Sequence, residues 1–292
     1  MRITTRQTLA ALCGVVALAT SAAVSSPAAA TTPTGGVYVA MGDSYTAGPL
    51  ILPQSDLLTC VRSSANYPGL VAASLHPTAF RDVSCSSAQT KDFSAPQKGA
   101  VSGTNPPQYN ALSADTTLVS VGIGGNDIGL VGLAESCINV LPAPIGKSCA
   151  AKYTAGGVDV YSQKIQAFAP TYGTVIAQIR SRAPHAKILL VGYPTAIRNG
   201  GCFPVQPVLP PDATYLQAKI DELNSVMKAQ AQSNGASYVD IRTSSVGHDS
   251  CALPGIRWLE GLVPLSPAFP LHPNELEMQN TTRVVLGQLS QV

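Results

Sequence analysis

Ser44 stands where a nucleophile could be held on a rigid element. An apolar run rich in β-formers, Val37–Met41, predicts a buried strand, and Gly42 and Asp43 separate its end from Ser44. Open α/β sheets bind ligands at the carboxyl ends of their strands. A helix beginning at this point would add free N–H groups and a positive dipole end, which suit an oxyanion. The alternative is that Asp43 and Ser44 only cap this helix.

A serine nucleophile needs a general base, a group that orients the base and donors for the oxyanion. His76 and His185 lie beside prolines in expected connections, which favours surface positions. His248 lies in a loop close to a cysteine, and we interpret it as structural. His272 precedes Pro-Asn at the entry to the last helix, and such loops suit catalytic groups. His272 is therefore the candidate base.

The elements that would position these residues alternate between strands and helices. We expect strands at 37–41, 80–85, 116–123, 187–193 and 238–241, and helices at 67–75, 158–182, 212–232 and 275–289. Pro170 is expected to break or kink the second helix, and residues 135–155 are expected to be irregular. The alternation predicts an α/β fold: a three-layer α/β/α sandwich with a central, mostly parallel sheet of about five strands.

The first 30 of the 292 residues have the pattern of an export signal. Two arginines in the first six residues precede an apolar stretch at 8–19, and three alanines at 28–30 form a cleavage site. We therefore predict a signal peptide at 1–30, cleavage near Ala30, a single domain at 31–292 and secretion. No later stretch is long enough for a membrane span.

The composition argues against some classes of partner. Charged residues make up 12% of the chain and the net charge is +2, so the basic surface typical of nucleic-acid binding is not expected. We expect a monomer with a small ester or lipid substrate. Catalysis by a serine and a histidine needs neither a metal ion nor an organic cofactor.

Six cysteines follow the signal segment, an even number that indicates disulfides in an exported chain. Six cysteines allow 15 pairings. The simplest is sequential, with pairs Cys60–Cys85, Cys137–Cys149 and Cys202–Cys251. The spacing does not resemble that of zinc ligands.

Four short blocks together resemble the secreted esterase/lipase branch of the SGNH (GDSL-type) serine hydrolases. The blocks are Gly42-Asp-Ser-Tyr45, Cys85-Ser-Ser-Ala88, Gly124-Gly-Asn-Asp127 and His272-Pro-Asn274. Their order fits the family, and the resemblance extends from about Val37 to the end of the chain. The competing Gly-x-Ser-x-Gly elbow is absent from the sequence.

The resemblance implies a role for each matching residue. Ser44 would be the nucleophile and His272 the base. The oxyanion would be held by the backbone N–H groups of Ser44 and Ser87 and by the side-chain amide of Asn126, with Ser86 as an alternative to Ser87. Asp43 and Asp127 are expected to form turns and caps.

The last block departs from the family's usual Asp-x-x-His, because Phe269 stands three residues before His272. We therefore expect a backbone carbonyl to orient the imidazole, either that of Phe269 or that of a neighbour such as Ser266. A distant carboxylate, Asp240 or Asp249, is the alternative.

The substrate is expected to be a carboxyl ester with a short or medium acyl chain, and lipids are possible. Apolar residues in Ile51–Leu58 and Trp258–Phe269 are candidates for an acyl site. The alternatives are a polysaccharide deacetylase of the same fold and an exported binding module without activity.

Overall fold

The structure is a computed structural model that describes Met1 and residues 35–290. The expected signal segment and its cleavage site lie outside the described residues, apart from Met1. Five parallel strands form a central sheet in the order β4-β1-β7-β8-β9. The strands are β1 Val37–Gly42, β4 Ala79–Asp82, β7 Thr116–Gly122, β8 Lys187–Val191 and β9 Ser237–Val239. The predicted fold class is confirmed.

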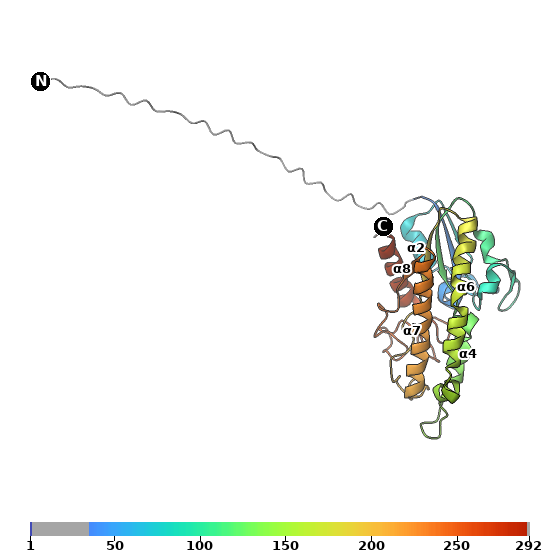
Figure 1. Cartoon of the computed structure of the whole chain (residues 1–292), viewed down its shortest axis with the longest axis vertical. Coiled ribbons are helices and arrows are strands. Elements are labelled where there is room, and N and C mark those ends of the chain that lie inside the picture. The colour runs from blue at the N-terminus through green and yellow to red at the C-terminus, as the bar shows by residue number, and fades with distance from the viewer. Residues whose placement is uncertain (2–34, 291–292) are drawn as a thin grey trace. The chain divides into compact units, whose positions relative to one another are not determined.

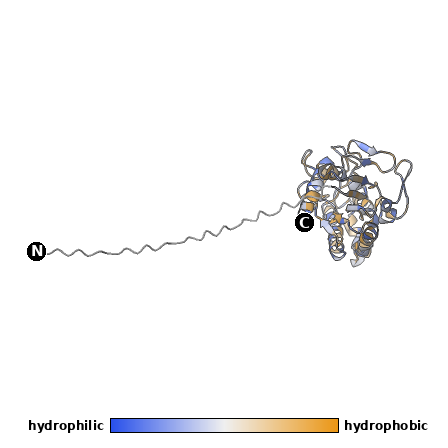
Figure 2. Ribbon diagram, turned by 90° about the horizontal axis from the view of Figure 1, so that it is seen from above, coloured by the Kyte–Doolittle hydropathy of each residue, from blue (hydrophilic) through white to orange (hydrophobic). Residues whose placement is uncertain are grey.

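Helices cover both faces of the sheet (Figure 1). Side chains alternate along β1: Val39 and Met41 join the core beneath one pair of helices, whereas Tyr38 and Ala40 join the core beneath another. The first pair is α6 Val160–Arg182 and α7 Pro210–Ser233, and the second is α2 Tyr67–Leu75 and α8 Glu275–Ser290. Figure 2 shows apolar residues on the sheet and on the helices around it.

The long elements agree with the predicted ranges to within a few residues, with two exceptions. Pro170 does not end the second long helix, because α6 runs from Val160 to Arg182. The stretch expected to be irregular contains the short helix α5 Cys149–Tyr153, and α4 Leu130–Ser136 ends just inside its start. The other α-helices are α1 Ser44–Ala47 and α3 Gly125–Ile128. Two small two-stranded sheets pair β2 Gln54–Asp56 with β3 Arg62–Ser63 and β5 Gln97–Lys98 with β6 Thr104–Asn105. Short 3-10 helices lie at Thr90–Phe93, Gln108–Ala111 and Ala155–Gly157.

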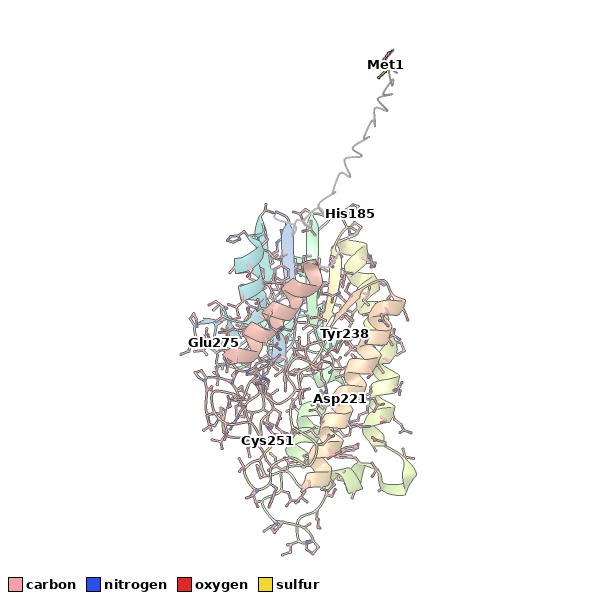
Figure 3. All side chains as sticks on the ribbon, turned by 90° about the vertical axis from the view of Figure 1, so that its left-hand side faces the viewer. Met1, His185, Asp221, Tyr238, Cys251 and Glu275 are labelled. Atoms are coloured by element: carbon pink, nitrogen blue, oxygen red, sulfur yellow. A yellow bond between two sulfur atoms is a disulfide. The ribbon has the colours of Figure 1, made fainter. Side chains whose placement is uncertain are left out.

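The carboxyl ends of β1 and β7 approach each other closely. Gly42 pairs with Gly122 and has a φ of 149°, and a Cβ at Gly42 would lie 2.4 Å from the Gly122 carbonyl oxygen. Only glycine fits this position. Figure 3 shows His185, which precedes β8, at one end of the sheet, and Cys251 among the loops at the other end. The loops that carry candidate functional residues therefore follow the carboxyl ends of the strands.

The structure forms the three predicted disulfides, Cys60–Cys85, Cys137–Cys149 and Cys202–Cys251. Such bonds are typical of proteins in oxidising compartments and suggest secretion. Among the described helices, none combines the length and the apolar character that a membrane crossing requires.

Candidate active site

Ser44 is the first residue of α1, directly after β1. Asp43 caps this helix: its backbone is extended and its Oδ1 accepts from the Tyr45 N–H at 2.9 Å. The first N–H groups of a helix have no partner within the helix. In the part of the chain that the structure describes, the Ser44 N–H has no acceptor. The serine thus presents its hydroxyl and a free N–H at the same place.

His272 reaches Ser44 from the loop before α8, 228 residues further along the chain. Its Nε2 lies 2.8 Å from Ser44 Oγ, and its Nδ1 lies 2.7 Å from the carbonyl oxygen of Pro270. A carbonyl can only accept, so Nδ1 carries the proton and Nε2 is free to accept from the serine hydroxyl.

The carbonyl that contacts the imidazole is therefore that of Pro270, and the expectation for Phe269 is wrong by one residue. The Phe269 carbonyl instead accepts from the backbone N–H of His272 at 3.2 Å. This bond closes a turn in which Leu271 has a φ of 61°. Proline followed by a positive φ is the pattern of a type II turn. The turn engages the Phe269 carbonyl, so the Pro270 carbonyl remains available to accept from the Nδ1–H of His272.

The two alternative carboxylates bind elsewhere. Asp240 accepts from the N–H and hydroxyl of Thr243. Asp249 pairs with Arg198 at 3.1 Å. Ser266 has no contact with the imidazole among the described hydrogen bonds.

Burial sets the protonation state of His272. His272 is 8% exposed, and this burial lowers its pKa to about 4, although the hydrogen bond to Pro270 acts in the opposite direction. At neutral pH the imidazole is therefore uncharged and can accept a proton.

Three donors expected for the oxyanion follow three neighbouring strands. Ser44 follows β1, Ser87 follows β4, and Asn126 follows β7. The Ser86 N–H already donates to Cys60 at 2.9 Å, whereas the Ser87 N–H has no acceptor among the described residues. Asn126 donates one amide hydrogen to the Ala88 carbonyl at 3.0 Å, so its second amide hydrogen remains available.

The backbone at Ser87 adopts a φ of 66°, in the left-handed region that favours glycine. The Cys85 N–H anchors this turn by donating to the Gly42 carbonyl at 3.0 Å. A serine at this strained position indicates that the surrounding structure holds the turn.

Two tyrosines that the sequence analysis did not identify connect these segments. The Tyr193 hydroxyl, just beyond β8, donates to Asp43 Oδ2 at 2.6 Å and accepts from the Gly125 N–H at 2.8 Å. The Tyr45 hydroxyl donates to the Leu271 carbonyl at 2.8 Å. Burial raises the pKa of Asp43 to about 7, while its bonds to Tyr193 and Tyr45 counteract that rise.

The cleft beside Ser44 is largely apolar, and it spans about 500 Å³ when the open solvent at its mouth is included. Its apolar walls are Leu130, Val131 and Ala134 of α4, Leu216 and Ile220 of α7, and Ala196 and Leu271. None of the residues in Ile51–Leu58 lines this cleft, so their assignment to the acyl site is wrong. In the other expected segment, Trp258 stacks on His248 with ring centroids 3.5 Å apart.

The remaining histidines do not enter the cleft. His76 ends α2 with a φ of 50°, and His185 lies at the opposite end of the sheet from Cys251 (Figure 3). The His248 Nδ1 contacts the Ile256 carbonyl at 2.7 Å. Asp127 accepts from the Thr90 N–H and hydroxyl, which fits its predicted structural role.

Known proteins resemble the chain over most of its length. Residues 40–278 match the model of the GDSL-like Lipase/Acylhydrolase family. "Lipase 2" of Streptomyces coelicolor is 37% identical over 261 residues, which cover 86% of this chain and 85% of the relative.

Two solved structures have similar folds. The crystal structure of phospholipase A1 from Streptomyces albidoflavus has a TM-score of 0.71 and 29% identity, over 86% of this chain and 98% of that one. The extracellular lipase from Streptomyces rimosus has a TM-score of 0.70 and 28% identity, over 86% and 99% of the two chains.

Proposed function

We propose an acyl-enzyme mechanism for this chain, which belongs to the GDSL-like lipase/acylhydrolase family and is a carboxylic ester hydrolase. The observation that carries the proposal is the 2.8 Å contact between Ser44 Oγ and His272 Nε2. The Pro270 carbonyl supports it by fixing the tautomer in which Nε2 accepts.

In the first half-reaction, His272 Nε2 takes the proton from Ser44 as Oγ attacks the ester carbonyl. The N–H groups of Ser44 and Ser87 and the amide of Asn126 stabilise the negative charge on the tetrahedral oxygen. His272 then protonates the departing alcohol, and the acyl group stays on Ser44.

In the second half-reaction, His272 takes a proton from water, which attacks the acyl-serine. The same donors stabilise the second tetrahedral species, and Ser44 leaves with the proton from the imidazolium. The carboxylic acid is released and the free enzyme is restored. The Pro270 carbonyl stabilises the imidazolium less than a carboxylate would, but it preserves the orientation of the ring.

The substrates proposed are esters with an apolar acyl group, because apolar side chains dominate the walls of the cleft. We also propose that the chain is exported with cleavage near Ala30 and that the mature chain is a monomer. N-terminal sequencing of the secreted protein and its mass by light scattering test these two points.

A fluorophosphonate probe tests the nucleophile and separates an enzyme from a binding module. We expect the probe to label the wild-type chain on the Ser44 peptide and to abolish hydrolysis of p-nitrophenyl acetate. Ser44→Ala and His272→Ala should lose both labelling and turnover. Hydrolysis that persists in Ser44→Ala would contradict the proposal.

A further inference from the structure

A second cavity adjoins the cleft that contains Ser44. It encloses about 430 Å³ of space, a figure that includes space open to solvent, and four residues line both spaces: Ala134, Ala196, Leu216 and Leu271. These residues form the shared boundary of the two cavities. Two of them are alanines, so little side-chain volume separates the spaces.

The second cavity offers no charge to a ligand. Its other lining residues are Ile138, Ile197, Gln206, Pro207, Val208, Ser250, Leu259 and Leu262, and none of them is ionisable. The Gln206 amide is occupied at both ends: Nε2 donates to the Ser250 carbonyl at 3.2 Å, and Oε1 accepts from the Leu262 N–H at 3.1 Å. Every lining residue is buried or half-buried. The space therefore suits an apolar ligand.

Covalent and backbone bonds hold the walls of this cavity in place. Ile138 and Val208, which both line it, are joined by an antiparallel backbone bridge. Disulfides lie directly beside the wall, since Cys137 precedes Ile138 and Cys251 follows Ser250. A cavity with fixed walls binds a ligand with a smaller loss of conformational entropy.

We infer that this second cavity binds the distal part of a straight acyl chain of medium length while the carbonyl carbon is held at Ser44. The inference rests on the proposed function. The alcohol portion of a lipid ester carries polar groups, which would lose their hydration in this uncharged space without gaining partners. Methylene groups instead gain from burial there, which assigns the cavity to the acyl side of the ester.

A series of p-nitrophenyl esters from acetate to dodecanoate tests the inference with a constant leaving group. We expect kcat/KM to rise about fourfold for each methylene that enters the second cavity, the factor that corresponds to about 0.8 kcal/mol. The rise should end once the cavity is filled. A flat profile from butanoate onward would overturn the inference.

Two substitutions on α4 provide a matched comparison. Ala134→Phe places a ring at the boundary of the two cavities, and we expect it to lower the octanoate-to-acetate ratio of kcat/KM at least tenfold. Glu135→Phe changes the neighbouring exposed residue, which lines neither space, so this ratio should stay within about threefold of the wild type. Equal ratios in the two variants would overturn the inference.

Val208 lines the second cavity but not the cleft, so a smaller side chain there should have the opposite effect to Ala134→Phe. Val208→Ala enlarges the cavity, so the preferred acyl chain should become longer.

A series of alkyl acetates checks the assignment, because Ala134→Phe should not change the preference for alcohol length. If Ala134→Phe alters that preference instead, the cavity binds the alcohol, and the inference is wrong.

The same experiments distinguish a failure of the acyl-cavity assignment from a failure of the proposed function. If the wild-type chain hydrolyses acetate and reacts with the fluorophosphonate, but Ala134→Phe and Val208→Ala leave chain-length preference unchanged, only the acyl cavity is refuted. If the wild-type chain reacts with neither ester nor probe, the proposed function itself fails.

Discussion

The Tyr193 hydroxyl lies 2.6 Å from Asp43 Oδ2, although 150 residues separate the two in sequence. The same hydroxyl accepts from the Gly125 N–H. Asp43 caps the helix that begins at Ser44, and Gly125 precedes Asn126. One phenol at the end of β8 therefore links the segment that carries the proposed nucleophile to the segment that carries a proposed oxyanion donor.

Replacement of Tyr193 by phenylalanine tests this link. Tyr193→Phe leaves the Gly125 N–H and Asp43 Oδ2 buried without their partner, so we expect the free energy of unfolding to fall by about 1–3 kcal/mol. We also expect kcat to fall by at least about tenfold, since a small displacement of catalytic groups is costly.

Tyr238→Phe is the matched control, because the Tyr238 hydroxyl makes no hydrogen bond among the described residues. Urea midpoints and kcat should change little in this variant. If both tyrosine variants have the same kcat, the positioning role of Tyr193 is refuted.

The contrast between Tyr193 and Ser44 shows what can be predicted from the sequence. Ser44 follows an apolar strand in a recognisable block, and His272 lies in another, so local patterns identify both. The hydrogen bond of Tyr193 forms only when β1, β7 and β8 are aligned, and no local pattern encodes this alignment. Likewise, Leu271 gives no glycine signal for the turn that assigns the imidazole to Pro270 rather than Phe269.

The walls of the cleft illustrate the same limit. Ile51–Leu58 contains apolar residues and follows the proposed nucleophile, but it does not line the cleft. The walls come from α4 and α7, whose residues meet at the cleft through tertiary packing. The existence of most strands and helices follows from their hydrophobic patterns, whereas such long-range neighbours do not.

The pH dependence of kcat/KM should reflect a buried histidine. Because the pKa of His272 is lowered to about 4, the imidazole is neutral above this value and becomes protonated below it. We expect kcat/KM to fall as the pH decreases through about 4. An acidic limb centred near 6.5, the value of an exposed histidine, would contradict this expectation.

The pKa of Asp43 lies closer to neutrality than that of His272, so the two titrations can be distinguished in one pH profile. Burial raises the pKa of Asp43 to about 7, so a second inflection near this pH would come from the cap of α1. Asp43→Asn retains the capping oxygen without the charge. The variant should lose the inflection near 7 and keep the limb near 4.

Glu277 of α8 provides a test of stability against pH. Its Oε2 is buried without a partner among the described residues, and burial raises its pKa to about 8. Between about pH 4.5 and 8 the folded state binds more protons at this site than the unfolded state. The contribution of Glu277 to the free energy of unfolding therefore decreases as the pH rises through that window.

Glu277→Gln removes this titration. At pH 9 the variant should exceed the wild type in stability by at least about 1 kcal/mol, since each pKa unit corresponds to about 1.36 kcal/mol. At pH 5 the two chains should be nearly equal. Urea unfolding at both pH values measures the difference, and an identical difference at pH 5 and 9 would rule out the buried charge as its source.

Asn126→Ala tests the proposed oxyanion donor. Loss of one such donor costs about 2.7–4 kcal/mol of transition-state stabilisation, so we expect kcat to fall by about 100- to 1,000-fold with a small change in KM. A rise in KM with unchanged kcat would show that Asn126 binds the substrate and the transition state equally, which would contradict the role of an oxyanion donor. The urea midpoint controls for the lost bond to Ala88.

The most direct test is the intact mass of the enzyme after acid quenching during turnover of p-nitrophenyl butanoate. The mechanism predicts a species heavier by one butanoyl group, with the adduct on the Ser44 peptide, and no such species in Ser44→Ala. An adduct on another residue, or full turnover by Ser44→Ala, would contradict the account.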